Sequence, residues 1–337
     1  SKDLFYLTGI KERLTERLVM LIVTNQDVHF IAPDFELVNL SKKDKRILVT
    51  HGWSDGENPF QIVDSLLPIG EQVVAMGGQS PSWILMGSMK VRPNYSWIAA
   101  DSLLADMRSV KDENEYKQLQ QAQEYACRAF QRLLEHELNG MKEVDVAKLL
   151  IQYIENEGMT VQDWPIVASG TNSALPHHHA GDRLIGYGDA VVIDFSGEHV
   201  SGYQSDTTRT VVVKRCPDGF QDIYDVTRNA NQAALEAAKP GVRCQDVDRA
   251  ARSVITEAGY GEYFTHRLGH GLGMDVHEHP YIIEGNEEII RVGNVFSDEP
   301  GIYIDGQYGV RIEDILFVGS KGAERLTPLG HKLLVVD

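Results

Sequence analysis

The sequence predicts an α+β protein with two domains, on three observations. The chain has 337 residues, which is about twice the length of a typical domain. Segments with helical periodicity and short apolar runs of β type are both present, and they are grouped. A polar stretch at residues 108–114 separates the two halves. We therefore expect a smaller α/β domain at residues 1–107 and a larger domain at 108–337, with helices around a mostly antiparallel sheet.

Composition excludes several classes of protein. With 42 % hydrophobic and 24 % charged residues, the chain is too apolar to be disordered. Its formal net charge of −17 disfavours nucleic acid and anionic membranes as partners. No apolar run reaches about 18 residues, and the first residues do not have the basic-then-apolar pattern of a signal peptide, so we expect neither a membrane span nor a secretory signal. The three cysteines lack CxxC spacing, which predicts reduced thiols in a cytoplasmic protein without a cysteine-bound zinc site.

The first half contains signals for short strands and one helix. Apolar runs at 18–24 and 28–32, separated by Asn25-Gln26-Asp27, predict a hairpin. A helix is expected at 58–67. Further strands are expected at 46–50, 71–76 and 83–86.

The second half contains longer helices. Apolar residues from Tyr116 to Leu134 recur on one helical stripe that ends at Asn139-Gly140, and a second helix carries Val144 to Ile154. Helices are also predicted at 220–238, before Pro240-Gly241, and at 245–258, before Gly259. Strands are predicted at 190–195, 207–213, 295–297 and 310–318.

Five acidic or imidazole residues lie in or beside these second-half strands: Asp194, Asp206, His270, Glu299 and Glu313. Burial of an unpaired charge costs several kcal/mol, so each carboxylate in an apolar run needs a compensating partner. For any one of them, a backbone hydrogen bond or an arginine would suffice. A pair of divalent cations explains all five together, since two ions of charge +2 balance four carboxylates and leave one position for a neutral imidazole.

Oxygen-rich ligation with one imidazole and no thiolate suits Mn²⁺ or Co²⁺, and also Fe²⁺, better than structural Zn²⁺. Two such ions about 3.5–4 Å apart lower the pKa of a bridging water and polarise a carbonyl group. The ligands do not specify which metal binds.

Other histidines surround this group. We interpret His178 and His179, in a run of three, as part of a solvated loop or an adventitious metal site, and His199 and His279 as incidental. His266 is expected to act through a hydrogen bond to a neighbouring ligand. Rival motifs are absent: no GxGxxG or GxxxxGK phosphate loop, no HExxH and no Gly-x-Ser-x-Gly elbow occurs.

At these residues the sequence resembles the pita-bread-fold metallopeptidases, the family of Xaa-Pro dipeptidase (prolidase), aminopeptidase P and methionine aminopeptidase. The resemblance implies a creatinase/aminopeptidase-like catalytic domain and, through Phe5-Tyr-Leu-Thr-Gly9, the smaller N-terminal domain of prolidases and aminopeptidase P. It rests on residues 169–177, Asp194 with 202–210, 266–278, 299–303 and 310–314, in the family's order.

The resemblance also implies a ligand set. Asp194 and Asp206 would bind one metal, with Asp206 bridging to the second. His270 and Glu299 would complete the second site, and Glu313 would bridge both ions. The cofactor would be two divalent ions, with Mn²⁺ expected and Co²⁺, Fe²⁺ or Zn²⁺ as alternatives. Glu299 would also accept a proton from the metal-bridging water, which attacks as hydroxide, and would pass that proton to the leaving nitrogen.

Substrate contacts follow from the same resemblance. His177 and His277 would contact the substrate and stabilise the tetrahedral intermediate. His266 and Arg311 would support the site, and Arg267 is a candidate for binding the substrate's C-terminal carboxylate. A homodimer is expected from the family alone.

Two features depart from the family pattern. The interval between Asp194 and Asp206 is one residue longer than usual, and we expect the turn at 196–201 to absorb the extra residue, since an insertion within a strand would reverse the side of a ligand. The chain also begins close to residues 5–9, which a helix and a strand precede in relatives. Either the protein is short here or residues that precede Ser1 are missing, so the sequence does not define the edge of the small domain's sheet or any dimer contact there.

The expected function is hydrolysis of Xaa-Pro bonds in dipeptides, because the close spacing from His270 to Glu313 resembles that of small bacterial prolidases. The main alternative is an Xaa-Pro aminopeptidase that acts on longer peptides. A creatinase-like hydrolase would lack these ligands, and a non-catalytic binding protein would have lost at least one of them.

Overall fold

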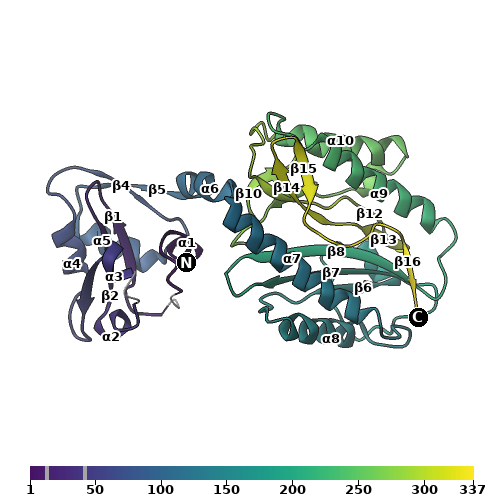
Figure 1. The fold of residues 1–337 in the computed structure, drawn as a ribbon, viewed down its shortest axis with the longest axis horizontal. Coiled ribbons are helices and arrows are strands. Elements are labelled where there is room, and N and C mark those ends of the chain that lie inside the picture. The colour runs from purple at the N-terminus through teal and green to yellow at the C-terminus, as the bar shows by residue number, and fades with distance from the viewer. Residues whose placement is uncertain (12–14, 41–43) are drawn as a thin grey trace. The chain divides into compact units, whose positions relative to one another are not determined.

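The computed structural model describes residues 1–11, 15–40 and 44–337. The chain divides into two compact units, Ser1–Ala105 and Asp106–Asp337 (Figure 1). The domain boundary predicted after residue 107 lies two residues beyond this division.

Two small sheets make up the β-structure of the N-terminal unit. The first has the order β1-β2-β3, with an antiparallel β1/β2 pair and a parallel β2/β3 pair; the second is the parallel pair β4/β5. The predicted hairpin is thereby confirmed. The strands are β1 (Met20–Val23), β2 (Val28–Pro33), β3 (Val49–Trp53), β4 (Val73–Met76) and β5 (Ser96–Ala99).

The helices of this unit are short, and two sequence predictions fail here. Residues 83–86, predicted as a strand, lie in a helix, because a run of four apolar residues does not distinguish a period of 2 from one of 3.6. Residues 46 and 47 of the predicted strand 46–50 also belong to a helix. The helices are α1 (Lys2–Thr8), α2 (Asp34–Leu37), α3 (Asp44–Ile47), α4 (Phe60–Leu66), α5 (Ser82–Val91) and α6 (Asp101–Ser109), which continues into the second unit.

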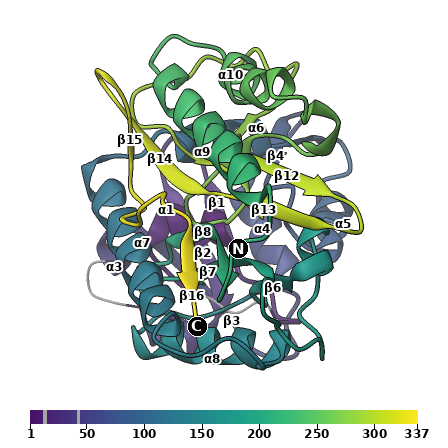
Figure 2. The ribbon, with the colours of Figure 1, turned by 90° about the vertical axis from the view of Figure 1, so that its right-hand side faces the viewer.

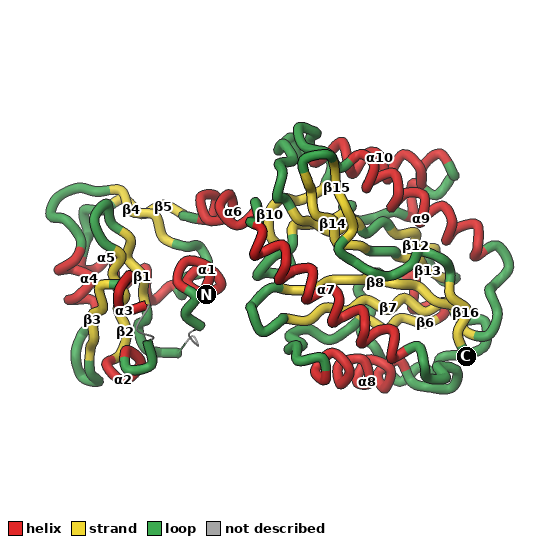
Figure 3. Tube along the Cα trace, viewed as in Figure 1, coloured by secondary structure: helices red, strands yellow, loops and turns green. Residues whose placement is uncertain are grey.

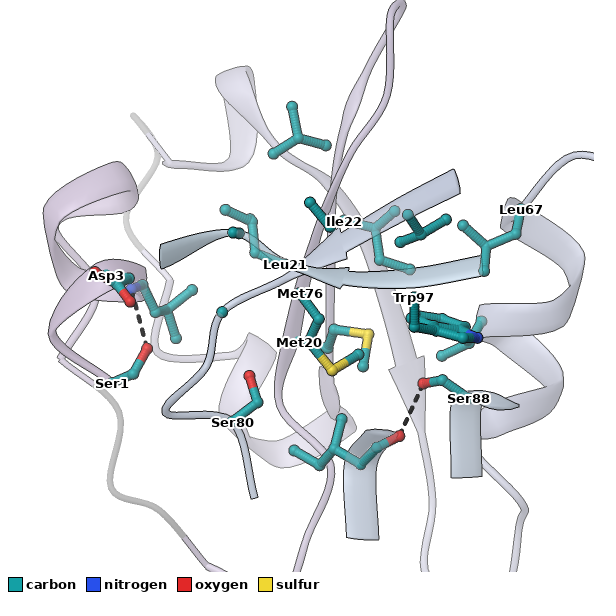
Figure 4. A pocket seen from close by; sticks show the side chains of 18 of the residues that line it. Ser1, Asp3, Met20, Leu21, Ile22, Leu67, Met76, Ser80, Ser88 and Trp97 are labelled. Carbon is teal, nitrogen blue, oxygen red and sulfur yellow. Dashed lines mark hydrogen bonds between the residues drawn. The ribbon is translucent and has the colours of Figure 1, made fainter. Parts of the chain in front are cut away.

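A cavity of about 640 Å³ lies inside the N-terminal unit, between β1 and β4 (Figure 4). Consecutive residues from Met20 to Asn25 and from Gln72 to Gly77 line it, so the cavity borders the edges of these strands. Within the described residues, β1 pairs only with β2 and β4 only with β5. The indole Nε1 of Trp97, on the same cavity, has no hydrogen-bond partner there. The cavity separates the two sheets.

The C-terminal unit contains a four-stranded sheet of order β16-β8-β7-β6 and a five-stranded sheet of order β10-β9-β11-β14-β15, with a separate hairpin β12-β13. All pairs are antiparallel except β16 with β8, as expected for this half. The strands are β6 (Ile166–Ser169), β7 (Ala190–Glu198), β8 (Gln204–Val213), β9 (Gly269–Gly271), β10 (Glu278–Ile282), β11 (Val295–Asp298), β12 (Gly301–Ile304), β13 (Tyr308–Arg311), β14 (Asp314–Gly319), β15 (Gly322–Arg325) and β16 (Leu334–Val336).

Four long helices cover these strands from two sides (Figures 1 and 2). One apolar core joins α7 and α8 to β6, β7 and β8, and another joins α9 and α10 to the remaining sheet and hairpin. In Figure 3 the helices accordingly form the outer layers around the strands. All four were predicted within a few residues: α7 (Glu113–Leu133), α8 (Glu143–Asn156), α9 (Phe220–Ala237) and α10 (Cys244–Glu257), with short 3₁₀ turns η1 (Gly170–Ala174) and η2 (Gly261–Tyr263).

The predicted strand 310–318 is interrupted. Residues 308–311 pair in the hairpin, whereas residues 314–319 belong to the five-stranded sheet. The break falls at Ile312-Glu313, so the carboxylate of Glu313 lies between two sheets.

The polar stretch predicted as the domain junction is also more ordered than a linker. Arg108 and Lys111 are buried and pair with Glu278, the residue that follows His277. Asp112 then caps α7, since its side chain accepts hydrogen bonds from the first turn and Glu115 bonds back to the Asp112 backbone.

A buried ion pair joins β8 to β14. Arg209 donates to Asp314 Oδ1 at 2.7 Å and to the Glu313 carbonyl oxygen at 2.7 Å. Burial alone would raise the pKa of Asp314, but Arg209 and His331 outweigh it and hold that pKa well below its usual range. The four-stranded and five-stranded sheets are thus connected by charge beside Glu313.

Replacement of Arg209 by Met should lower the free energy of unfolding by about 3–5 kcal/mol, because the buried Asp314 carboxylate would lose one of its two arginine partners. Urea unfolding followed by circular dichroism measures the change. Arg243→Met is the control, since Arg243 pairs with Asp246 at the surface and its loss should cost less than about 1 kcal/mol. Equal stability of the two variants would contradict the prediction.

Candidate metal centre

Two of the predicted site residues lie on the neighbouring strands β7 and β8. Asp194 is opposite Thr208, and Asp206 is opposite Ser196, in a register that is continuous from Ala190↔Val212 to Glu198↔Gln204. Because positions two apart share a face, both carboxylates project from the same side of the sheet. No bulge interrupts the pairing. The turn predicted at 196–201 lies at 199–203 instead, because residues 196–198 are paired in β7.

His270 is held on β9 between two glycines. β9 is the strand between β10 and β11. A Cβ atom at Gly269 would overlap the Ser297 carbonyl oxygen of β11, and one at Gly271 would overlap the His279 carbonyl oxygen of β10. The Gly-His-Gly sequence therefore permits three backbones to approach closely around one imidazole.

Glu299 follows the end of β11, and Glu313 lies just beyond the end of β13. The Glu299 amide donates to the Leu268 carbonyl at 2.9 Å. The side-chain Oε1 of Glu299 lies 3.2 Å from His270 Nε2. Glu313 is fixed by Thr208, whose carbonyl accepts from the Glu313 amide at 3.0 Å and whose hydroxyl donates to Glu313 Oε2 at 2.7 Å. Backbone and side chain of Thr208 together place Glu313 on the Asp206 face.

The structure brings Asp206, His270 and Glu313 into one buried group. One potential ligand atom from each lies within 4.8 Å of the other two, and His270 Nε2 is 3.7 Å from Asp206 Oδ2. Glu299 joins the group through His270. Asp194 is outside the compact three, and its Oδ2 instead accepts a hydrogen bond from Arg311 at 2.6 Å.

The pKa values of the clustered carboxylates show that the buried group contains more negative than positive charge. Burial, and then the charge of neighbouring carboxylates, raise the pKa values of Asp206 and Glu313 well above normal. The pKa of Glu299 falls to about 2, because the hydrogen bond and charge of His270 outweigh the effect of burial. One imidazole therefore stabilises only part of this negative charge. Divalent cations would compensate the rest, and carboxylate oxygens with one imidazole are suitable donors for them.

Arg311 connects several parts of the centre. Besides Asp194, it donates to the Tyr303 hydroxyl at 2.9 Å, to Thr208 Oγ1 at 3.1 Å and to the Pro176 carbonyl at 3.2 Å. His266 Nε2 lies 2.9 Å from the same Tyr303 hydroxyl. Arg311 therefore contacts the proposed ligand Asp194 directly, whereas His266 hydrogen-bonds Tyr303 and the Arg267 carbonyl and not a proposed ligand.

The remaining predicted residues lie farther out. His277 packs edge-on against His270, with ring centroids 4.2 Å apart; desolvation and the cations of His270 and Arg267 lower its pKa to about 4. Arg267 lies over the ring of Tyr281, 4.7 Å from its centroid. His177 is exposed, and it is near enough to His266 to contribute to the lowered pKa of that residue, after the larger effect of burial.

Two histidines outside the predicted site have defined partners. His178 Nε2 lies 2.8 Å from the buried Glu143 carboxylate, and His199 is buried, with its Nδ1 2.7 Å from Ser201 Oγ. The sequence offered no local signal for the first contact, because Glu143 is far from His178 along the chain. The solvated loop expected at His178 is therefore wrong, because its imidazole is largely buried against Glu143.

Replacement of Gly269 by Ala should destabilise the protein by about 1–3 kcal/mol, because the new methyl group would meet backbone atoms that cannot rotate away. The measurement is the free energy of unfolding in urea. Gly330→Ala is a matched control: a Cβ added there would meet no atom within 4 Å, and a change below about 0.5 kcal/mol is expected. An unchanged free energy of unfolding for Gly269→Ala would contradict the prediction, because β9 could then lie farther from β11 at no cost.

Comparison with known proteins agrees with this arrangement. An Xaa-Pro dipeptidase of Pyrococcus horikoshii is 35 % identical over 317 residues, covering 93 % of this chain and 88 % of the relative. A prolidase structure from Thermococcus sibiricus superposes with a TM-score of 0.91 at 36 % identity, covering 99 % of this chain and 92 % of that one. An X-Pro aminopeptidase structure from Thermotoga maritima superposes with a TM-score of 0.87 at 31 % identity, covering 98 % of this chain and 93 % of that one.

In the residues described, no helix is long and apolar enough to cross a bilayer. Residues 1–110 match the Creatinase/Prolidase N-terminal domain. Residues 117–320, more than half of the chain, match Metallopeptidase family M24 and contain the whole buried group. The chain belongs to the M24 family of metallopeptidases.

Proposed function

We propose that this protein is an Xaa-Pro dipeptidase that uses two divalent cations. The observation that carries the proposal is the convergence of Asp206, His270 and Glu313 in a buried position, with ligand atoms within 4.8 Å of one another. Asp194 and Glu299 complete the proposed ligand set. The prolidase names of relatives that align over most of the chain support the choice of substrate.

The bound cations would lower the pKa of a water molecule between them and polarise the substrate carbonyl. In this proposal, Glu299 accepts a proton from that water and delivers it to the nitrogen of the leaving proline. No serine or cysteine nucleophile is required.

The substrate would lie against the histidines at the rim of the group. His277 is neutral at pH 7 with a pKa of about 4, so it can donate one hydrogen bond to a developing oxyanion without adding charge. His177 would contact the substrate beside His266. Arg267 would bind the C-terminal carboxylate that a dipeptide presents.

We further propose Mn²⁺ as the metal, a cytoplasmic location and a homodimer. The absence of thiolate donors from the buried group favours a metal that prefers oxygen ligands. The three cysteines are free, and two of them are buried with pKa values raised to about 12, which is compatible with a reducing compartment. The homodimer rests on the resemblance to the family.

The second candidate is an Xaa-Pro aminopeptidase, which the similarity to the Thermotoga structure favours. It would use the same catalytic group and differ in whether the site accepts residues beyond proline.

The two candidates are separated by their substrates. With Mn²⁺ supplied, the protein should release proline from Ala-Pro at a rate at least tenfold above cleavage of Ala-Pro-Ala, and a chelator should abolish both reactions. Free proline and free alanine are measured by chromatography. Preferred cleavage of the tripeptide would assign the aminopeptidase activity, and cleavage of neither with any metal would refute the proposed function.

Replacement of Glu299 by Ala should reduce kcat for Ala-Pro by at least about 10³-fold and weaken metal binding, since it removes both a ligand and the proposed proton carrier. Steady-state kinetics and elemental analysis of the dialysed protein give the two readouts. Glu262→Ala, an exposed carboxylate on η2, is the control and should change neither. Unchanged turnover of Glu299→Ala would exclude this residue from proton transfer.

A further inference from the structure

The loop that carries His177 is tied to a buried carboxylate. Glu143, at the start of α8, is completely buried. It accepts hydrogen bonds from the Ser169 amide and hydroxyl, both at 2.7 Å, and from Asn172 Nδ2 at 3.0 Å. His178 Nε2 lies 2.8 Å from the same carboxylate, and the Gly181 amide donates to it at 3.4 Å. Five groups spread over the loop 169–181 thus converge on one side chain.

The protonation of this contact is determined by its partners. Burial opposes ionisation of Glu143, but hydrogen bonds from Ser169 and His178 outweigh it and lower its pKa. An ionised carboxylate only accepts hydrogen bonds, so His178 must carry its proton on Nε2. Arg183 strengthens the network, since it donates to Ser169 Oγ at 2.6 Å and pairs with Asp189.

The loop is also held immediately before His177. The carbonyl of Pro176 accepts a hydrogen bond from Arg311, the same arginine that contacts Asp194. His177 therefore lies between two anchored residues, Pro176 and His178. In the described part of the chain its own imidazole makes no hydrogen bond, so its position depends on these neighbours.

Burial of a carboxylate is unfavourable, because the free energy of its desolvation must be offset by hydrogen bonds from several well-placed donors. An apolar residue at position 143 could pack without that cost, but it could not fix the orientation of an imidazole. The arrangement instead fixes the geometry of the loop at the residue that follows His177.

We propose that Glu143 and His178 are a positioning pair that holds His177 in place for the substrate. The inference rests on the proposed function, which gives His177 its substrate contact. Neither member of the pair touches the reacting atoms; both act through His177. Their contribution should therefore depend on the presence of the His177 imidazole.

The run of three histidines supplies the matched experiment. His177→Ala, His178→Ala and His179→Ala are compared in the Mn²⁺-loaded protein with Ala-Pro as substrate. His179 is exposed, and its side chain makes no hydrogen bond in the described residues, so its loss should change kcat/KM less than about twofold. His178→Ala should lower kcat/KM by about 10- to 100-fold through misplacement of His177. His178→Gln, which can still donate to Glu143, should recover most of the activity.

The double variant His177→Ala/His178→Ala separates positioning from general stability. If His178 acts through His177, the double variant should be no less active than His177→Ala alone, within about twofold. Metal content and melting temperature are recorded for every variant. Where His178→Ala does not fold, His178→Asn, whose side chain is too short to reach Glu143, takes its place in the cycle.

The outcomes are distinguishable. His178→Ala with the activity of His179→Ala would overturn the inference, as would multiplicative losses in the double variant. Normal activity of His177→Ala would instead refute the proposed substrate contact of His177, and with it the inference. Inactivity of the unmodified, metal-loaded protein on Ala-Pro would refute the proposed function itself.

Discussion

The organisation of the C-terminal unit depends on the need to keep several carboxylates and one imidazole together away from water. Asp206, His270 and Glu313 are buried, and their negative charge is compensated only in part by neighbouring cations. Such a group persists only where rigid surroundings prevent its members from separating. The antiparallel register of β7 and β8, and the close approach of backbones on both sides of β9, provide that rigidity.

Charged residues outside the group reinforce the same constraint. Arg209 connects the two larger sheets beside Glu313, and Arg311 links Asp194 to the loop that precedes His177. Both guanidinium groups are buried and each bonds to several acceptors at once, a role that suits a planar donor better than lysine. The acidic centre is thus enclosed by cations that bind its surroundings and leave Asp206 and Glu313 available to a metal.

Much of this could be predicted from the sequence, for identifiable reasons. The four long helices have clear apolar stripes, and Asp194 and Asp206 stand at the ends of apolar runs that only a strand explains. By contrast, the apolar run at 83–86 has no readable period and forms a helix. The strand expected at 310–318 divides at Glu313, because a short interval of sequence does not reveal which sheet each part joins. The partnership of Glu143 with His178 was not foreseen, since long-range contacts between polar side chains leave no local pattern.

The distribution of the candidate ligands along the chain has a consequence for assembly. Asp194 and Glu313 mark the ends of the set, and its members come from one hairpin, one interior strand of the five-stranded sheet and two loops between sheets. No continuous peptide contains more than a fraction of the donors, so a partly folded chain would bind a divalent ion only weakly. The chain would therefore bind the cations only after its tertiary structure is complete, and cation binding would indicate a fully folded protein. By mass action, tight binding to the native state alone would then protect the finished protein against unfolding.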